Sequence, residues 1–317
     1  MIKILVNDGI HPDGKSLLEG AGFQVDTEKV AQENLPNELP NYDAIVVRSA
    51  TKVRQDLIDL CPNLKVIARG GVGLDNIDVD YARNKGIKVM NTPTASSQAV
   101  AELAFGHMFT LVRSLHDANR KMLTQGDTEF KTLKKAYSKG TQLRGKTLGI
   151  FGFGNIGQET ARIGAALGMK ILPVDPIVEE AEVEINVFNA ESVKAKIKTV
   201  SLDEMLGQAD FISLHVPFIG KPFFSSDEFS KMKDGVILIN CARGGTVDEN
   251  ALLAALESGK VAAAGLDVFE NEPTPRKELL EHPRISLSPH IGASTLEAQA
   301  NIGKELADQL IAFFSES

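Results

Sequence analysis

The chain has 317 residues, of which 43% are hydrophobic and 24% are charged, and this composition suits a globular protein and excludes the disordered and fibrous classes. Its length is sufficient for two domains with separate cores. The formal net charge of -8 repels the phosphates of nucleic acids and no local basic patch offsets it, so we expect small molecules as partners.

Short apolar runs rich in β-branched residues alternate with amphipathic segments along the whole chain. This alternation predicts an α/β fold with parallel sheets covered on both faces. The predicted strands of the first third form one doubly wound lobe and cover residues 2–6, 44–47, 66–68 and 87–90. A helical pattern over residues 96–123 then predicts a long helix that connects this lobe to the next, and the polar segment 124–140 follows it.

The second half of the chain predicts another doubly wound lobe. Its strands match the count of a six-stranded dinucleotide-binding sheet and cover residues 148–151, 171–174, 211–216, 236–240, 263–268 and 285–288. An amphipathic pattern over residues 295–314 predicts a final helix. We expect this helix to return to the first lobe.

The N-terminus and the cysteines indicate the compartment. The residues MIKILVNDG lack the apolar region of a signal peptide, and no apolar run approaches the roughly 18 residues that cross a bilayer. We therefore expect a cytoplasmic protein without membrane contacts. The two cysteines, Cys61 and Cys241, are expected to stay reduced in that compartment.

A glycine-rich motif follows the first strand of the second lobe. Residues 152–157, GFGNIG, have the spacing G-x-G-x-x-G and open a helical pattern, so a pyrophosphate can rest on backbone amides at a helix N-terminus. Asp175 follows the next strand, about 20 residues later, where an acid hydrogen-bonds the adenosine ribose. Because a carboxylate repels the 2′-phosphate of NADP, the pattern predicts NAD. The alternative is structural: a tight turn and a solvated aspartate.

Three polar residues stand just beyond the carboxyl ends of strands in the second lobe, where open α/β sheets bind ligands: Arg243, Glu272 and His290. Arg243 lies in CARGG, where glycines leave its guanidinium room to bind a planar carboxylate. A carboxylate paired with a histidine favours the imidazolium, so Glu272 strengthens His290 as an acid. Oxidation of a 2-hydroxy acid needs these groups: a base for the hydroxyl proton, a cation for the carboxylate and a group that tunes the base.

The patterns considered so far leave alternatives open. A single histidine or arginine at a strand end is more often structural than catalytic. Glu270 competes with Glu272 for the role of the carboxylate. Cys241 and Asp248 are further candidates for other roles, and periodicity does not choose among them.

Motifs over nearly the whole chain carry a family resemblance. They are IVVRSATKV (45–53), ARGGVGLDNID (68–78), VMNTP (89–93), GKTLGIFGFGNIGQ (145–158), INCARGGTVDE (239–249), AGLDVFENEP (264–273) and SPHIGAST (288–295). Together they resemble the D-isomer-specific 2-hydroxyacid dehydrogenases, and among them the D-3-phosphoglycerate dehydrogenases most closely. The resemblance implies a homodimer in which a Rossmann NAD-binding domain, residues 99–292, is inserted into a flavodoxin-like substrate domain, residues 1–98 and 293–317, with the active site in the cleft.

The resemblance also assigns site residues. The family's catalytic residues are the arginine of CARGG, the glutamate before the proline of DVFxxEP and the histidine of PHxGAST. They fall on Arg243, Glu272 and His290, which favours Glu272 over Glu270. The residues expected to contact NAD are Gly152, Gly154, Asn155, Ile156, Gly157, Asp175, Val216, Cys241, Ala242, Arg243, Asp267, His290, Gly292 and Ala293. Those expected to contact the substrate are Arg48, Ser49, Gly71, Val72, Gly73, Arg243 and His290. No metal site is expected.

Two departures from the family matter. The family commonly has a TPxT turn where this chain reads HVPFIGKPFF, which leaves the adenine-side contacts of His215–Phe218 open. Many D-3-phosphoglycerate dehydrogenases carry a further serine-sensing domain, whereas this sequence ends at Ser317, so serine feedback by that route is not expected.

The implied reaction is the NAD-dependent oxidation of D-3-phosphoglycerate to 3-phosphohydroxypyruvate, a step of serine biosynthesis, with His290 as acid and base. A phosphorylated acid needs extra cations, which Arg48, Lys134 and Lys135 can supply, the lysines across a dimer interface; the alternative is a solvated lysine run. Within the family, a reductase of glyoxylate, hydroxypyruvate or D-lactate is the alternative. An NAD(H)-sensing binding protein similar to the C-terminal-binding-protein corepressors is the alternative of another class.

Overall fold

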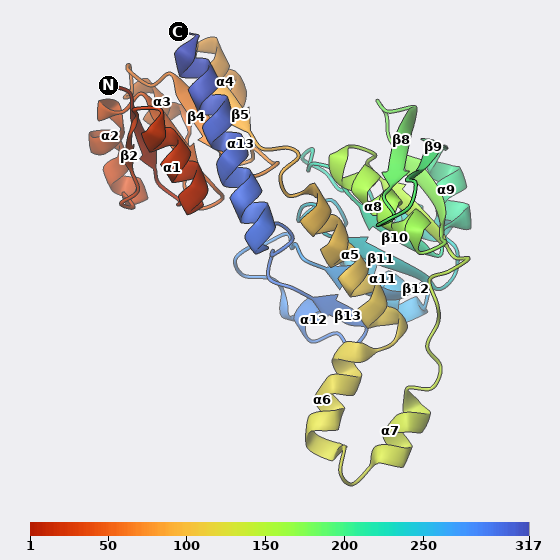
Figure 1. Cartoon of the computed structure of the whole chain (residues 1–317). Helices are drawn as coiled ribbons and strands as arrows, with labels where there is room; N and C mark the ends of the chain where they lie inside the picture. The colour runs from red at the N-terminus through yellow and green to blue at the C-terminus, as the bar shows by residue number, and fades with distance from the viewer. Residues whose placement is uncertain (317) are drawn as a thin grey trace. The chain divides into compact units, whose positions relative to one another are not determined.

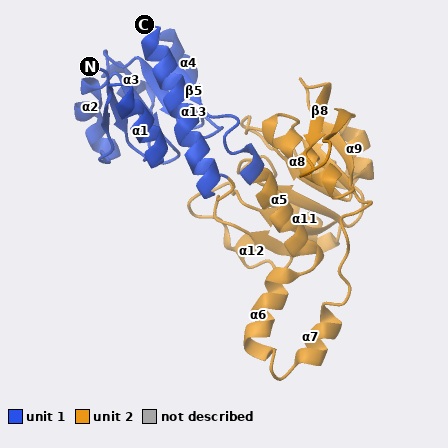
Figure 2. Ribbon diagram, in the orientation of Figure 1, with its two compact units in different colours: residues 1–99, 293–317 blue, residues 100–292 orange. Residues whose placement is uncertain are grey.

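The computed structural model describes residues 1–316, which divide into two compact units (Figure 2). Unit 1 consists of Met1–Ala99 and Ala293–Ser317, and unit 2 consists of Val100–Gly292. Each unit has its own parallel sheet covered by helices (Figure 1). The α/β fold with two doubly wound sheets that the sequence predicts is therefore confirmed.

Unit 1 contains a five-stranded parallel sheet with the strand order β2-β1-β3-β4-β5. Its strands are β1 (Lys3–Val6), β2 (Gln24–Asp26), β3 (Ala44–Val47), β4 (Val66–Arg69) and β5 (Lys88–Asn91). This flavodoxin-like order has its switch point between β1 and β3, where successive strands are added in opposite directions. Strand β2 escaped the sequence analysis because it has three residues, of which only Val25 is buried.

The helices of unit 1 lie on both faces of this sheet (Figure 1). They are α1 (Pro12–Gly20), α2 (Leu35–Glu38), α3 (Gln55–Asp59), α4 (Val79–Asn84) and α13 (Leu296–Ser315), with 3₁₀ turns at Gln32–Asn34 and Leu39–Asn41. Helix α13 packs on unit 1, as predicted. It approaches α1 so closely that a Cβ on Gly14 would lie 2.4 Å from the carbonyl oxygen of Gly303.

Unit 2 contains a six-stranded parallel sheet with the order β13-β12-β11-β10-β6-β7. Its strands are β6 (Thr147–Phe151), β7 (Lys170–Val174), β10 (Phe211–Leu214), β11 (Val236–Asn240), β12 (Val261–Leu266) and β13 (Ile285–Leu287). The six predicted strands are thus confirmed, with ends that differ by at most two residues. The switch point lies between β6 and β10, and the order is that of unit 1 with one strand added, rather than the 3-2-1-4-5-6 order of many dinucleotide-binding sheets.

An antiparallel hairpin lies beside β7, where that common order places a third parallel strand. It consists of β8 (Glu180–Ile185) and β9 (Val193–Lys198). Glutamates on β8 stand opposite lysines on β9 in every second register pair, three pairs in all, whereas apolar residues in the pairs between them pack towards the core. The sequence analysis missed this hairpin.

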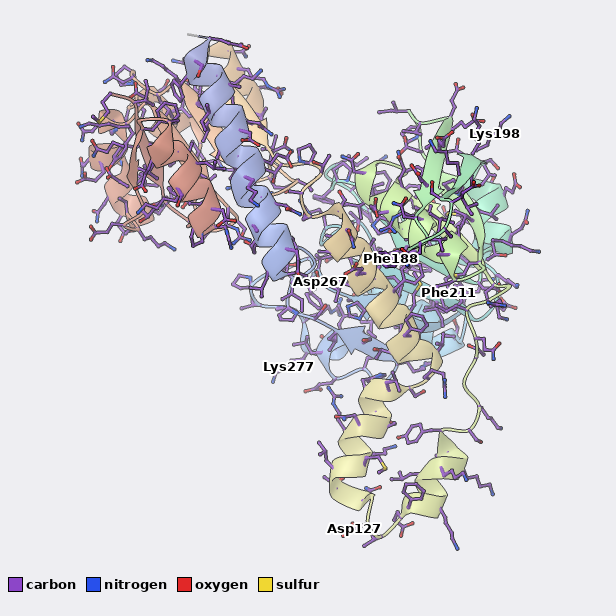
Figure 3. The ribbon with its side chains drawn as sticks, in the orientation of Figure 1. Asp127, Phe188, Lys198, Phe211, Asp267 and Lys277 are labelled. Carbon is purple, nitrogen blue, oxygen red and sulfur yellow. The ribbon has the colours of Figure 1, made fainter. Side chains whose placement is uncertain are left out.

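The helices of unit 2 include one correction to the sequence analysis. They are α5 (Ser97–Val112), which begins in unit 1, α6 (Leu115–Gln125), α7 (Phe130–Ala136), α8 (Asn155–Ala166), α9 (Leu202–Gln208), α10 (Ser226–Lys231), α11 (Glu249–Ser258) and α12 (Lys277–Leu280). The single long helix predicted over residues 96–123 is wrong, because Ser114 has a φ of 50° and this left-handed residue separates α5 from α6. Helices α6 and α7 extend away from the sheet, and Asp127 lies in the connection between them (Figures 1 and 3).

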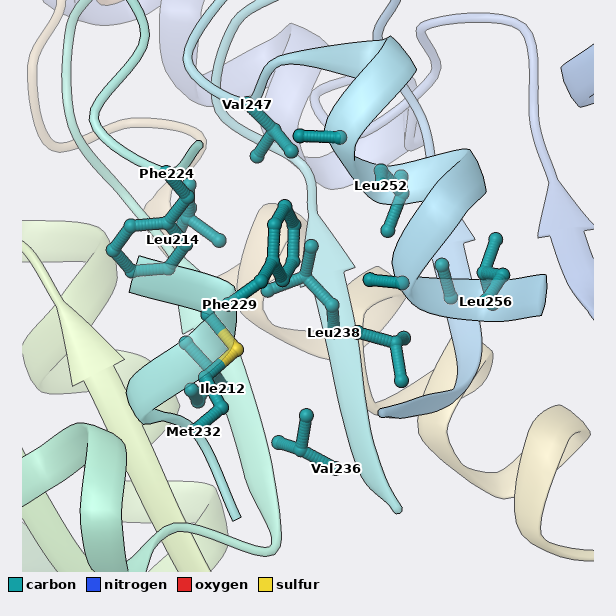
Figure 4. Packing of buried hydrophobic residues seen from close by; sticks show 14 of the residues in the cluster. Ile212, Leu214, Phe224, Phe229, Met232, Val236, Leu238, Val247, Leu252 and Leu256 are labelled. Atoms are coloured by element: carbon teal, nitrogen blue, oxygen red, sulfur yellow. The ribbon is translucent and has the colours of Figure 1, made fainter. Parts of the chain in front are cut away.

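A large hydrophobic cluster fixes the strands of unit 2 (Figure 4). Ile212 and Leu238 project from the sheet, and Phe229 of α10 and Leu252 of α11 pack on them. Each is at most 3% exposed, and burial of such a side chain contributes about 1.5–3 kcal/mol. This core therefore holds in place the strand ends that carry polar side chains.

Two further features concern the whole of the described chain. No helix among residues 1–316 combines the length and the apolar character needed to cross a bilayer. Cys61 and Cys241 are free thiols, each buried within its own unit, and burial raises the pKa of both, that of Cys61 to about 11.

Candidate active site

The glycine motif forms the turn between β6 and α8. Gly152 has a φ of 96°, and a Cβ there would lie 2.5 Å from the carbonyl oxygen of His215, so glycine is required. A Cβ on Gly157 would lie 2.0 Å from the oxygen of Gly152. Gly154 is the N-cap of α8, and a Cβ placed on it would meet no atom within 4 Å. The first turn of α8 can therefore receive a pyrophosphate on its backbone amides.

Asp175 follows β7 and binds the glycine turn. Its Oδ2 accepts a hydrogen bond from N–H of Phe153 at 2.7 Å, and its Oδ1 accepts from Ile177 and Val178 at 2.8 and 2.9 Å. Burial acts to raise the pKa of Asp175, but these backbone donors outweigh it and hold the pKa below its usual value. Because a carboxylate has about four acceptor positions, room remains for a ribose hydroxyl. The residues present thus fit NAD.

His215 follows β10 at the switch point. Burial lowers its pKa to about 3, so the ring is neutral. Its Nε2 lies 3.0 Å from Oγ1 of Thr160 and 2.9 Å from Oγ of Ser213, and its Nδ1 has no hydrogen-bond partner within residues 1–316. Phe218 is 42% exposed and would contact a Cβ placed on Gly245. The adenine-side role of residues 215–218 stays a prediction.

Glu272 and His290 form a hydrogen-bonded pair. Oε2 of Glu272 lies 2.7 Å from Nδ1 of His290, and Oε1 accepts from N–H of Phe269 at 3.0 Å. Burial acts to raise the pKa of Glu272, but these hydrogen bonds, with the charges of His290 and Arg243, hold it below its usual value. Since Nδ1 is engaged, Nε2 is the ring nitrogen that can exchange a proton with a ligand. The His290 side chain is 46% exposed, so a ligand can reach it.

The competing acidic residues have other partners. Oε1 of Glu249 accepts from N–H of Glu270 at 2.9 Å, and Oε1 of Glu270 accepts from N–H of Glu249 at 3.3 Å. Asp248 caps α11 by accepting from Asn250 and Ala251. The structure therefore brings Glu272, and not Glu270, to the histidine.

Arg243 lies in the turn that follows β11. Asn240 stabilises this turn, because its Nδ2 donates to the carbonyl oxygen of Arg243 at 3.2 Å and its Oδ1 accepts from N–H of Ala242 at 3.1 Å. A Cβ on Gly244 would lie 1.8 Å from the carbonyl oxygen of Phe269. The Arg243 turn therefore packs directly against the loop that leads to Glu272.

Asp267, at the end of β12, holds the loop that carries His290. The aspartate is 1% exposed; its Oδ1 accepts from N–H of Ile291 and its Oδ2 from N–H of Gly292, both at 2.9 Å. Its carbonyl oxygen accepts from N–H of His290 at 2.8 Å. We call Asp267, Ile291 and Gly292 the Asp267 clamp. His290 has a φ of 55°, in the left-handed region that a residue with a side chain rarely adopts.

A pocket of about 380 Å³ opens beside Glu272 and His290. Its polar members are Glu272, Ser288 and His290, and the rest of its wall is apolar: Phe269, Pro273, Pro275, Leu280, Leu287 and Pro289. The imidazole thus stands at the edge of a largely apolar surface. Such surroundings strengthen electrostatic interactions with a bound ligand.

In unit 1, Asp8 holds the loop after β3 by accepting its N–H groups, as Asp267 holds the loop after β13 in unit 2. Its Oδ2 accepts from N–H of Arg48 at 2.7 Å and of Thr51 at 3.0 Å, and its Oδ1 accepts from Oγ1 of Thr51 at 2.8 Å. Nδ2 of Asn76 donates to the carbonyl oxygens of Arg48 and Thr51. We call Asp8, Arg48 and Thr51 the Asp8 clamp. The sequence analysis missed Asp8 and Asn76, although Asp8 stands at a strand end, the signal that identified Arg243.

Two pockets of unit 1 share Arg48. One of about 370 Å³ is lined by Asn7, Asp8, Gly9, Thr27, Lys29, Arg48, Ser49 and Ala50, and another of about 280 Å³ includes Gly70, Gln299 and Ile302. Lys29 therefore adds a second cation beside Arg48, which the sequence analysis did not identify. Gly71, in the predicted segment Gly71–Gly73, has a φ of 144° and donates its N–H to Oγ1 of Thr92.

The remaining predicted residues lie as follows. Val216, Cys241 and Ala242 lie in the loops after β10 and β11 of unit 2, and Ala293 begins the second segment of unit 1. Lys134 and Lys135 are exposed in the last turn of α7. Within the described residues no group of three or more His, Cys, Asp or Glu side chains is arranged to hold a metal ion.

Comparisons with known proteins agree with this arrangement. The family model "D-isomer specific 2-hydroxyacid dehydrogenase, NAD binding domain" matches residues 105–292. A hydroxypyruvate reductase of Thermotoga maritima is 45% identical over 314 residues, which cover 97% of each chain. A D-3-phosphoglycerate dehydrogenase of Methanocaldococcus jannaschii is 42% identical over 98% of this chain but only 57% of its own length. The crystal structure of a glyoxylate reductase from Paecilomyes thermophila superimposes with a TM-score of 0.81 at 32% identity, covering 98% of this chain and 94% of the other.

Proposed function

This chain belongs to the D-isomer-specific 2-hydroxyacid dehydrogenase family, and we propose that its substrate within the family is D-3-phosphoglycerate, which it oxidises to 3-phosphohydroxypyruvate for serine biosynthesis. The chain is an NAD-dependent oxidoreductase. The single observation that carries the proposal for the active site is the hydrogen-bonded Glu272–His290 pair beside Arg243.

The proposed roles follow from the chemistry of the side chains. Arg243 binds the substrate carboxylate, and Nε2 of His290 accepts the proton of the C2 hydroxyl as hydride leaves C2. NAD, when bound, supplies the acceptor for that hydride. Glu272 stabilises the imidazolium that results, since its carboxylate is ionised and bonded to Nδ1. In the reverse reaction the same imidazolium donates its proton to the carbonyl oxygen.

The residues proposed to hold NAD are those of the glycine turn and its neighbours. The amides of Gly154, Asn155 and Ile156 receive the pyrophosphate, and Asp175 binds the adenosine ribose. The open space at Gly154 and the remaining acceptor position on Asp175 support this assignment.

The proposal of a phosphorylated substrate is supported by the cations of unit 1. Arg48 and Lys29 line one pocket with the hydroxyls of Thr27 and Ser49. Guanidinium, ammonium and hydroxyl groups are the usual donors to a phosphate monoester. Asp8 accepts the backbone N–H of Arg48, so the side chain of Arg48 extends from a fixed backbone position.

Steady-state rates with purified protein test the substrate. We expect the highest kcat/KM with 3-phosphoglycerate, in comparison with glycerate, lactate, hydroxypyruvate and glyoxylate. Arg48→Gln should lower kcat/KM for 3-phosphoglycerate about 10- to 100-fold and change the value for glycerate far less, because it removes charge-assisted hydrogen bonds to phosphate. Lys52→Gln is the matched control, since Lys52 is a nearby cation outside both pockets. Equal rates with 3-phosphoglycerate and glycerate would remove the phosphorylated substrate from the proposal.

The second candidate function is reduction of hydroxypyruvate. The observation that favours it is the similarity to the hydroxypyruvate reductase of Thermotoga maritima, which is 45% identical over 97% of both chains. In that case hydroxypyruvate should be the best substrate of the panel, and Arg48→Gln should lower its kcat/KM only slightly.

We further propose that the protein is a homodimer that uses helices α6 and α7. None of the residues of α6 is buried. Leu115, Met122, Leu123 and Phe130 are between 44% and 81% exposed, and such a group of apolar side chains marks an interaction surface. Light scattering of wild-type protein and of Leu123→Asp tests this: a dimer that dissociates in the variant is expected, and a wild-type monomer would contradict it.

A further inference from the structure

A chain of buried polar groups connects helix α5 to the Asp267 clamp. His107 of α5 is 4% exposed and packs on β12 at Gly265, where a Cβ would lie 2.7 Å from the Cβ of the histidine. Nδ1 of His107 lies 2.9 Å from Oγ of Ser286, and Nε2 lies 2.9 Å from Oγ of Ser288. Oγ of Ser288 is in turn 2.6 Å from Oδ1 of Asp267.

The chemistry of these groups fixes the direction of each hydrogen bond. The carboxylate of Asp267 only accepts, so the hydroxyl of Ser288 donates to it. With that proton committed, the oxygen of Ser288 accepts from Nε2–H of His107. Burial lowers the pKa of His107, although the charge of Asp267 opposes this, and the neutral ring accepts the hydroxyl proton of Ser286 at Nδ1. All the bonds run the same way, from the hydroxyl of Ser286 to the carboxylate of Asp267.

We propose that His107 and Ser288 are positioning residues for the proton transfer at His290 and that they act through Asp267. The proposal rests on the role proposed above for His290. Hydrogen bonds that run in one direction polarise one another and end here on a charge, where each is strongest. These hydrogen bonds therefore fix the rotation of the Asp267 carboxylate.

The orientation of this carboxylate decides the backbone conformation at the imidazole. Its two oxygens accept from N–H of Ile291 and Gly292, the residues that follow His290. His290 holds its left-handed φ only because the surrounding structure imposes it. A carboxylate free to rotate would release these two N–H groups and let the imidazole leave its place beside Glu272.

The two serines offer a matched pair of variants. Ser286→Ala and Ser288→Ala each remove one hydroxyl from the same imidazole, but only the second breaks the link to Asp267. We expect kcat of Ser288→Ala to fall about ten-fold, with the KM of the 2-hydroxy acid changed less than about two-fold. Ser286→Ala should keep the kcat of the wild type. Ser288→Thr, which retains the hydroxyl, should restore most of kcat.

Amide hydrogen exchange tests the same link without substrate or catalysis. The N–H groups of Ile291 and Gly292 should exchange about ten-fold faster in Ser288→Ala, and at the wild-type rate in Ser286→Ala. His107→Leu should increase exchange at the same two amides. If Ser288→Ala does not fold, Ser288→Cys, which offers a weaker donor, replaces it.

The outcomes separate this inference from the proposed function. Equal kcat and equal exchange in the two alanine variants would overturn the inference, and so would wild-type kcat and exchange in a folded His107→Leu. Wild-type kcat in His290→Gln would instead remove His290 from the proposed mechanism. In that case faster amide exchange at Ile291 and Gly292 in Ser288→Ala would still show that the hydrogen bonds from His107 to Asp267 hold the loop that carries His290.

Discussion

The Asp8 clamp of unit 1 and the Asp267 clamp of unit 2 have the same geometry in different surroundings. In each, an aspartate at the end of one strand accepts N–H groups from the loop after the neighbouring strand. Asp8 lies among amides, with Asn7 and Asn76 bonded to the same loop. Asp267 lies at the end of a buried histidine–serine chain and holds a residue of positive φ.

This difference indicates different tasks. The Arg48 loop is held by Asp8 and two asparagine side chains and contains no residue of positive φ, which suits the proposed selection of a substrate by Arg48. The loop with His290 in a rare conformation is held by Asp267 through its backbone and by Glu272 through the imidazole, which suits the proposed proton transfer, whose rate depends on the angle of the ring. Changes in the Asp8 clamp should therefore appear mainly in the KM of the substrate, and changes in the Asp267 clamp mainly in kcat.

The largest effect is expected at His290. His290→Gln removes the proposed acid and base, so kcat should fall about 10²- to 10⁴-fold, while the Kd of NADH changes only a few-fold. Stopped-flow and fluorescence titration measure the two quantities. Near-normal turnover would place the chemistry elsewhere and end the division of tasks between the units.

A third aspartate extends the comparison to the cofactor. Asp175 binds the glycine turn of the neighbouring strand β6 as Asp8 and Asp267 bind their loops. Asp175→Ala should reduce the preference for NAD over NADP about 10- to 100-fold, since it removes the proposed charge-assisted hydrogen bond to the ribose and the repulsion of a 2′-phosphate. Kinetics with both cofactors measure this ratio. An unchanged ratio would leave Asp175 with a structural role alone.

Asp8→Ala sharpens the comparison from the side of unit 1. The loss of three hydrogen bonds to the Arg48 loop should raise KM for the substrate about ten-fold, with kcat and the Kd of NADH close to wild type. Asp13→Ala is a control, because this aspartate is half exposed and lines neither pocket. A variant in which kcat falls and KM stays constant would contradict the assignment of substrate selection to this loop.

The smallest effect concerns stability in acid. Burial lowers the pKa of His215 to about 3 and also lowers that of His107, so both are neutral in the folded state and bind a proton on unfolding. The contribution of His215 to the free energy of unfolding is fully present above pH 6.5 and is lost as the pH falls towards 3, by about 1.4 kcal/mol per pH unit; His107 adds to the loss below pH 6.5. Hydrogen exchange between pH 6.5 and 4.5 should therefore show unit 2 losing stability faster than unit 1. His215→Gln should reduce the slope of the stability of unit 2 against pH by about one proton. An unchanged slope would contradict the lowered pKa of His215.

The sequence could predict the parts of the candidate site that depend on neighbouring residues or on the order of the strands. The glycine turn needs only neighbouring residues, and Arg243, Glu272 and His290 stand in loops after successive strands that any parallel sheet brings to one edge. Glu272 and Glu270 are two residues apart, and the residues alone did not choose between them, because the choice depends on Glu249, which binds Glu270 from α11. His107 lies on an apolar helix, and its role depends on β13, 179 residues away.

The predicted helix over residues 96–123 fails for a related reason. Apolar residues continue with helical spacing across Ser114, so the pattern carries no sign of the interruption. Hydrophobic periodicity reports which face is buried and not the φ of one residue. Strand β2 and the β8–β9 hairpin were missed because short or charge-rich strands bury few side chains.

The hairpin of β8 and β9 also bears on how the protein behaves at high concentration. Strand β7 is the outer strand of its sheet and contacts β9 without pairing with it. An uncovered outer strand offers a row of N–H and C=O groups on which another chain can assemble into fibrils or disordered aggregates. The alternating glutamates and lysines of the hairpin place charge at this edge. The hairpin thereby protects the NAD-binding sheet against intermolecular strand pairing, a benefit separate from any role in catalysis.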